Sequence, residues 1–105
     1  MAIAVSSPKR SRSMPDVPTV AESGFPGFEA GSWFGIFAPR GTPPAVIARL
    51  HDEIIKVIRL PEVENGYLIS GNVAVTSRPE EFGVFIRNEL AKWGRVVREA
   101  KIQGE

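Results

Sequence analysis

The sequence predicts part of an α/β fold, with an incomplete sheet and two main amphipathic helices. Short apolar and aromatic runs, typical of strands, occupy the N-terminal part, whereas apolar residues at helical spacing dominate the C-terminal part. The length of 105 residues limits the chain to one small domain with a modest core. The expected order is strand, basic loop, helical turn, aromatic strand, helix, short helix, strand and long helix.

Three short segments have strand character. Ala2 to Ser6 is an apolar run that ends before Ser7-Pro8, which suits a buried parallel strand. Ser32 to Ala38 is rich in aromatic and branched residues and ends at Pro39, as a strand does. A brief strand is expected around Val73 to Val75.

A single helical turn is expected between Thr19 and Ser23. Thr19 and Glu22 have the spacing of a capping box, in which each side chain accepts a hydrogen bond from the other residue's amide. Gly24 follows as a helix stop.

The first long helix is expected from Pro43 to Arg59, capped by Thr42 and stopped by Pro61. Its apolar residues recur at helical spacing: Val46, Ile47, Leu50, Ile54, Val57 and Ile58. A weaker helix is expected from Pro61 to Ile69, interrupted by Gly66, which costs about 1 kcal/mol relative to Ala in a helix interior.

The second long helix is expected to begin with a capping box of Ser77 and Glu80 and to run to about Ala100. Pro79 suits its first turn. One stripe is apolar: Phe82, Phe85, Ile86, Leu90, Trp93, Val96 and Val97. We interpret this stripe as core packing rather than as a cofactor site.

Charge and composition exclude several function classes. Thirteen Lys and Arg face twelve Asp and Glu, so no general attraction to nucleic acid is expected. There is no cysteine for a disulfide or a thiolate site. No apolar run reaches the roughly 18 residues of a membrane span. The first residues lack the basic and apolar regions of a secretory signal, so the chain as written is expected to remain cytoplasmic.

Catalytic and metal-binding patterns are weak. His51 is the sole histidine, and its neighbours Asp52 and Glu53 are expected to point in different directions on a helix, so we interpret this face as solvated, between Arg49 and Lys56. No serine lies in a nucleophile elbow. The sequence therefore predicts no enzyme, no metal site and no cofactor.

Two further patterns have simple structural explanations. The basic cluster Lys9-Arg10-Ser11-Arg12 is interpreted as a solvated loop rather than a phosphate or nucleic-acid patch, because no basic stripe extends it. The glycines between the first strand and the first helix lack the strand and helix context of a phosphate loop, so they are expected to shape the backbone: Gly24, Gly27, Gly31 and Gly35.

Three stretches carry a family resemblance in order. IAVSSPKRSRSMPDVPTVAESGFPGFE is similar to a strand, a basic loop and an "lPdvPTvaEaG.pg" signature; SWFGIFAPRGTPPAVIARLHDEIIKVI and PEVENGYLISGNVAVTSRPEEFGVFIRNELAKWGRVVREAKI are similar to the segments that follow it. Together they resemble the C-terminal part of the tripartite tricarboxylate transporter solute receptors, the Bug receptors.

The resemblance implies the C-terminal portion of a type II periplasmic-binding-protein fold, with two α/β lobes that close on a ligand. Residues 1–31 would form the end of the second lobe and the inter-lobe connection, and residues 32–105 the return crossing strand and the helices that complete the first lobe. The implied ligand is a small carboxylate or related solute, and the implied partners of the full-length receptors, which are periplasmic, are membrane transporter subunits.

Ser32, Trp33 and Phe34 are the candidate ligand-binding residues. Neighbouring strand residues face opposite sides, so one of the two aromatic rings can pack inward while the other faces the cleft. Core packing is the alternative for these residues.

Two functions remain open. The chain is either a fragment of a solute-binding protein that binds ligand poorly alone, or a small non-enzymatic interaction or oligomerisation module derived from such a receptor. In both cases the strands lack neighbours, so weak stability or self-association is expected.

Overall fold

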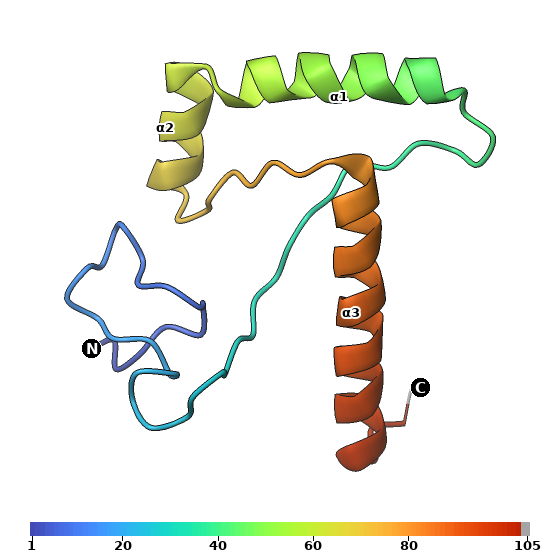
Figure 1. The fold of residues 1–105 in the computed structure, drawn as a ribbon. Helices are drawn as coiled ribbons and strands as arrows, with labels where there is room; N and C mark the ends of the chain where they lie inside the picture. The colour runs from blue at the N-terminus through green and yellow to red at the C-terminus, as the bar shows by residue number, and fades with distance from the viewer. Residues whose placement is uncertain (104–105) are drawn as a thin grey trace. The chain divides into compact units, whose positions relative to one another are not determined.

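The computed structural model describes residues 1–103, which form three helices: α1 (Pro44–Ile58), α2 (Pro61–Ile69) and α3 (Pro79–Glu99) (Figure 1). The chain divides into two compact units, Met1–Ala74 and Val75–Glu105. The first contains α1 and α2, which contact each other, and the second contains α3. The two predicted main helices and the weaker helix between them are therefore confirmed.

The predicted strands are reduced to one β-bridge in the described part of the chain. Val5 and Thr19 form an isolated parallel bridge, which agrees with the parallel sense expected for the first strand. That strand is not buried, since Ile3 is 77% exposed. Residues 32–38 and 73–75 form no ladder, so the strands predicted there are wrong for this chain. The physical reason is that a strand needs a neighbour to receive its backbone hydrogen bonds, and the described residues provide none beside these two segments.

Helix α1 begins with two prolines but without the predicted cap. Its N-cap residue is Pro43, and the Thr42 hydroxyl instead donates a hydrogen bond to the Pro39 carbonyl at 2.8 Å. The Thr42 amide donates to the same carbonyl at 3.2 Å, and Gly41 between them has a φ of +86°. Thr42 therefore closes the turn that leads into α1 rather than capping the helix.

Helix α2 has the predicted bounds, and Gly66 does not interrupt it. The helix ends where the Ser70 hydroxyl donates to the carbonyls of Gly66 and Tyr67 at 3.1 and 3.0 Å. Gly71, with a φ of +75°, then turns the chain. Only glycine adopts this left-handed conformation without steric cost.

Helix α3 begins one residue later than its predicted capping box. Arg78 is the N-cap, and its amide donates to the Glu81 carboxylate at 2.9 Å, so the pair of Ser77 and Glu80 was the wrong assignment. The pair of Ser77 and Glu80 and the pair of Arg78 and Glu81 have the same spacing. Because Pro79 is the first residue of the helix, Arg78 directly before it is the N-cap. The helix ends at Glu99 with Ala100 as its C-cap, close to the predicted end.

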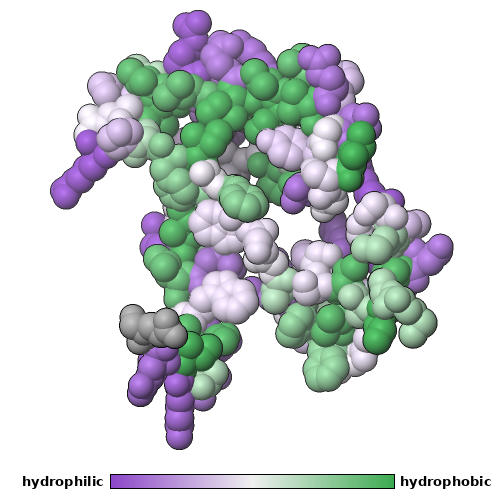
Figure 2. All heavy atoms as spheres, turned by 180° about the vertical axis from the view of Figure 1, so that it is seen from behind, coloured by the Kyte–Doolittle hydropathy of each residue, from purple (hydrophilic) through white to green (hydrophobic). Residues whose placement is uncertain are grey.

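Apolar side chains remain largely uncovered. Within residues 1–103, Thr19 is the one buried residue, at 2% exposure, and no apolar residue is buried. Leu50 of α1 and Leu90 of α3 are 49% and 71% exposed. Hydrophobic residues accordingly lie at the surface along both long helices (Figure 2). No side chain of the predicted α3 stripe is buried among the described residues, so the expected core packing is not observed there.

Candidate functional site

The predicted ligand-binding residues lie in an extended segment, residues 31–39, that connects the N-terminal loops to α1. Hydrogen bonds hold both ends of this segment. The Ala30 amide donates to the Ser6 carbonyl at 3.0 Å, and the turn from Pro39 to Thr42 closes the other end. The segment itself joins no ladder.

Ser32, Trp33 and Phe34 are all exposed, but to different degrees. Trp33 is 40% exposed, whereas Phe34 is 94% exposed. This difference between consecutive residues agrees with side chains on opposite sides of an extended backbone. Ile36 and Phe37 are 71% and 63% exposed, so the segment presents an apolar and aromatic surface.

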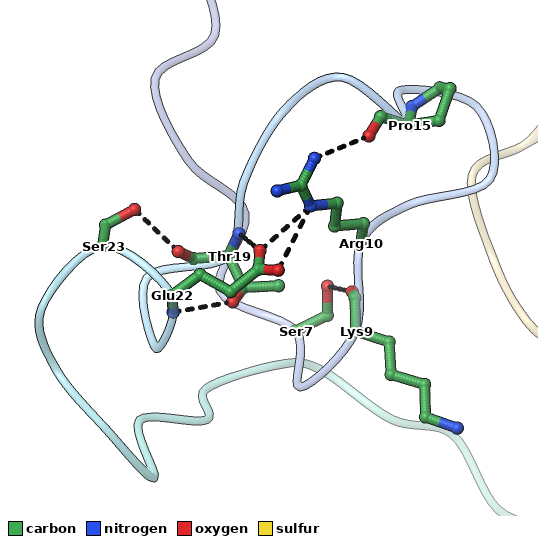
Figure 3. Close-up of polar contacts among 7 residues, drawn as sticks. All are labelled: Ser7, Lys9, Arg10, Pro15, Thr19, Glu22 and Ser23. Carbon is green, nitrogen blue, oxygen red and sulfur yellow. Dashed lines mark hydrogen bonds and ion pairs between the residues drawn. The ribbon is translucent and has the colours of Figure 1, made fainter.

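The turn before this segment contains the predicted capping box. The Thr19 amide donates to the Glu22 carboxylate at 2.8 Å, and the Glu22 amide donates to the Thr19 hydroxyl at 3.0 Å (Figure 3). The Ser23 hydroxyl and amide both donate to the Thr19 carbonyl, at 2.8 and 3.1 Å. Gly24 follows with a φ of +111°, as expected for the residue that ends a helical turn.

Arg10 closes the basic loop onto this turn. Its Nε lies 3.0 Å from Glu22 Oε2, and its Nη1 donates to the Pro15 carbonyl at 3.2 Å (Figure 3). The basic cluster is exposed, as predicted for a loop, but Arg10 is an internal ion-pair partner, which the sequence analysis missed. The charge complementarity of Arg10 and Glu22 was the available sign, although a separation of twelve residues does not by itself indicate contact.

The Glu22 carboxylate is electrostatically stabilised. The hydrogen bond from the Thr19 amide, followed by the one from the Arg10 guanidinium, lowers the pKa of Glu22 below its ordinary value of 4.5. Both donors favour the ionised form. The turn is therefore best formed when Glu22 carries its charge.

His51 and its neighbours show no metal geometry. His51 Nδ1 lies 3.4 Å from Asp52 Oδ1, so these adjacent side chains do meet, contrary to expectation. Arg49 and Lys56 instead pair with Glu53, at 3.3 and 2.9 Å. Across residues 1–103, no group of three His, Cys, Asp or Glu side chains is placed to hold a metal ion. Over the same residues, no helix is long and apolar enough to cross a membrane.

Comparison with known proteins identifies the family. Residues 1–102 match the model of the tripartite tricarboxylate transporter family receptor. The chain is 38% identical over 98 residues to Protein BugT of Bordetella pertussis, covering 93% of this chain and 30% of BugT. It is 37% identical over 102 residues to a UPF0065 protein from the tcbD-tcbE intergenic region of Pseudomonas sp. strain P51, covering 96% and 30%. The chain belongs to the receptor family of tripartite tricarboxylate transporters.

Solved structures confirm the fold class. The periplasmic binding protein BugD matches with a TM-score of 0.80 and 30% identity, over 97% of this chain and 35% of BugD. R. palustris Rpa4515 with adipate matches with a TM-score of 0.79 and 30% identity, over 94% and 33%. The chain therefore has the conformation of part of a periplasmic-binding-protein fold, and it spans about a third of the length of these relatives.

Proposed function

We propose that this chain is part of an extracytoplasmic receptor that binds a small carboxylate and delivers it to a tripartite tricarboxylate transporter. The match of residues 1–102 to the receptor family is the observation that carries the proposal. The adipate in the structure of Rpa4515 supports a carboxylate as the ligand class. The role is binding without a catalytic step, and in the complete receptor it takes place in the periplasm.

Within that receptor, we assign residues 1–31 to the end of the second lobe and the inter-lobe connection. Residues 32–105 supply the return crossing and the helices that complete the first lobe. Ser32, Trp33 and Phe34 would then border the cleft, with the Ser32 hydroxyl as a hydrogen-bond donor and an aromatic ring as a wall. The 94% exposure of Phe34 supports a role for this ring beyond packing within the chain.

The chain alone is expected to bind carboxylates weakly. About two thirds of the relatives' length has no counterpart in these residues, and a closed cleft needs both lobes. Calorimetric titration of the purified chain with adipate should show no saturable binding at millimolar ligand. Saturable micromolar binding by the chain alone would contradict the requirement for the rest of the receptor.

A small interaction module is the second candidate. The uncovered apolar residues of α1 and α3 favour it, because exposed apolar patches of this kind mark protein contacts. Such a module would associate with another polypeptide without any effect of carboxylates on the complex. Adding adipate to the complex of the chain with its polypeptide partner distinguishes the two functions. A ligand stabilises a complex that forms its binding site, whereas it does not change the stability of a simple interaction module.

A further inference from the structure

Helix α2 contains the one Asn-Gly pair of this sequence, Asn65-Gly66. Both residues are exposed, and no residue of α2 is buried. Apart from its chain neighbours and the helix's own backbone, no atom of the described residues lies within 4 Å of where a Cβ of Gly66 would stand. The peptide bond that joins Asn65 to Gly66 is therefore open to water and has room to rearrange.

This pair has the chemistry of spontaneous deamidation. Once the Gly66 nitrogen has lost its proton, it can attack the side-chain carbonyl carbon of Asn65. A bond forms between these two atoms, the Asn65 side-chain nitrogen leaves as ammonia, and a succinimide ring results. Glycine favours this attack because it has no Cβ to crowd its nitrogen and accepts a wide range of backbone angles. Water then opens the ring at either carbonyl. Opening at the former side-chain carbonyl gives aspartate, and opening at the main-chain carbonyl gives isoaspartate, in which the main chain runs through Cβ.

The other two asparagines of the sequence lack these conditions. Asn72 precedes Val73, whose branched side chain crowds the nitrogen that would attack. The Asn72 side-chain amide also donates a hydrogen bond to the Ser70 hydroxyl at 3.1 Å. Asn88 precedes Glu89 in the interior of α3, a helix of 21 residues. Asn72 and Asn88 therefore serve as internal references for the reactivity of Asn65.

The stability of α2 controls how often the pair can react. In an α-helix each amide donates to the carbonyl four residues earlier, so the Gly66 nitrogen is held until the helix opens. The Gly66 carbonyl is held as well, because it accepts hydrogen bonds from the Ser70 hydroxyl and amide at 3.1 and 3.2 Å. Helix α2 has nine residues, fewer than the roughly 12 to 15 that an isolated helix needs in water. We therefore expect α2 to open locally more readily than α3.

We propose that Asn65-Gly66 is a deamidation site, and that isoaspartate formed there melts α2. The additional backbone carbon of isoaspartate moves the amides on either side of it out of register with their helical partners. The new carboxylate also lies three residues after Glu62, and like charges at this spacing destabilise a helix. The contact of α2 with α1 depends on the folded helix and would weaken with it. This proposal concerns the chemical lifetime of the chain and does not depend on the proposed receptor function.

The test is to incubate the purified chain at neutral pH and to follow each asparagine by tandem mass spectrometry of its peptides. We expect Asn65 to deamidate at least about tenfold faster than Asn72 and Asn88. Raising the pH should speed the reaction, because the attacking nitrogen must lose its proton. Isoaspartate is distinguished from aspartate by enzymatic methyl transfer from S-adenosylmethionine to its carboxylate. Equal rates at the three asparagines, or aspartate without isoaspartate at residue 65, would overturn the proposal.

Two matched substitutions test the role of the glycine. Gly66→Ala places a Cβ beside the attacking nitrogen, whereas Gly94→Ala makes the same change in α3. We expect Gly66→Ala to slow deamidation at Asn65 by about tenfold or more, and Gly94→Ala to leave its rate unchanged. An unchanged rate in the Gly66→Ala chain, or equal slowing by both substitutions, would overturn the proposal.

Hydrogen exchange tests the effect on the helix separately from the reaction. The chain that has formed isoaspartate is compared with the Asn65→Asp variant, which carries the same added charge on an ordinary backbone. We expect the amides of α2 to exchange faster in the isoaspartate-containing chain than in this variant, and the amides of α3 to exchange equally in both. Equal exchange of the α2 amides in the two chains would overturn the proposal that the modification melts α2.

Discussion

The N-terminal loops and helix α3 are ordered by different kinds of hydrogen bonds. In residues 5–30, the bonds join distant parts of the chain, such as Arg10 with Glu22 and Ser6 with Ala30. In α3, they repeat along one continuous helix. The loops therefore have a tertiary arrangement but little apolar burial, whereas α3 has an apolar face along a single continuous helix. Regular backbone structure and a hydrophobic core are thus separate requirements, and this chain meets only the first.

The largest expected effect concerns cooperativity. Because neither region buries apolar side chains, the purified chain should unfold without a sharp calorimetric transition. A globular domain of this length would absorb about 70 kcal/mol at its midpoint. Scanning calorimetry measures whether the chain shows a heat-absorption peak of this size, and circular dichroism follows its helicity over the same temperatures. A monomer with one sharp transition of that enthalpy would show that the two regions share a core.

Thr19→Val should loosen the loops and leave α3 unchanged. The substitution removes the hydroxyl that accepts a hydrogen bond from the Glu22 amide. Loss of such a cap lowers the stability of the turn by about 1 kcal/mol. The Val5 amide donates a hydrogen bond to the Pro18 carbonyl, and the Val20 amide donates to the Val5 carbonyl. Both amide hydrogens should exchange with solvent about fivefold faster in the variant. Hydrogen exchange read by NMR provides the measurement. Ser11→Ala is the control, because its hydroxyl bonds only within the exposed loop, to Ser13; equal acceleration by both variants would argue against a special role of Thr19.

A Gly→Ala substitution should stabilise α3 but destabilise the N-terminal turn. Gly94→Ala should increase the helicity of α3, since Ala is favoured over Gly in helices by about 1 kcal/mol. The new Cβ would lie 3.4 Å from Arg98 Nη1, the end of a flexible side chain that can move. Gly24→Ala should instead weaken the turn by about 1 kcal/mol, because its φ of +111° is unfavourable for Ala. Circular dichroism measures the helicity of the Gly94→Ala variant, and hydrogen exchange measures the stability of the turn in the Gly24→Ala variant. If both substitutions were stabilising, or both destabilising, the proposed difference between the two regions would be wrong.

The smallest expected effect is a pH dependence confined to the loops. The pKa of Glu22 is lowered in the folded turn, so its stabilising contribution is present above the ordinary value of 4.5 and is lost as the pH falls through the lowered pKa. An NMR titration of the Glu22 carboxyl carbon measures this pKa directly. Arg10→Gln should raise it only partly, because the Thr19 amide is the larger cause. A pKa at or above 4.5 in the unaltered chain would contradict the observed contacts.

Local sequence patterns predicted the elements that local interactions stabilise. The capping box of Thr19 and Glu22 formed as expected, and the apolar spacing located both long helices to within a few residues. The errors at Thr42 and Ser77 concern which of two nearby residues begins a helix. Adjacent prolines and competing hydrogen-bond acceptors determine the first residue of each helix. The sequence pattern alone does not distinguish between two such neighbouring start positions.

The candidate site was harder to predict, because it depends on residues far apart in the chain. The exposure of Trp33 and Phe34, the anchoring of Ala30 on Ser6 and the pairing of Arg10 with Glu22 are all tertiary facts. The strand expected over residues 32–38 has strand-forming residues but no ladder. A side chain can favour an extended backbone, but only a neighbouring strand can complete its hydrogen bonds.

The sequence by itself determined the helices, the capped turn and the family of this protein, because each follows from residue types at short spacing or in a fixed order. The tertiary structure alone decided that no apolar residue is buried in the described part of α1 and α3 and that Arg10 closes the N-terminal loop. Burial depends on what surrounds a residue rather than on the residue itself. The same apolar pattern can therefore form a core where other segments cover it, and it stays exposed where none does.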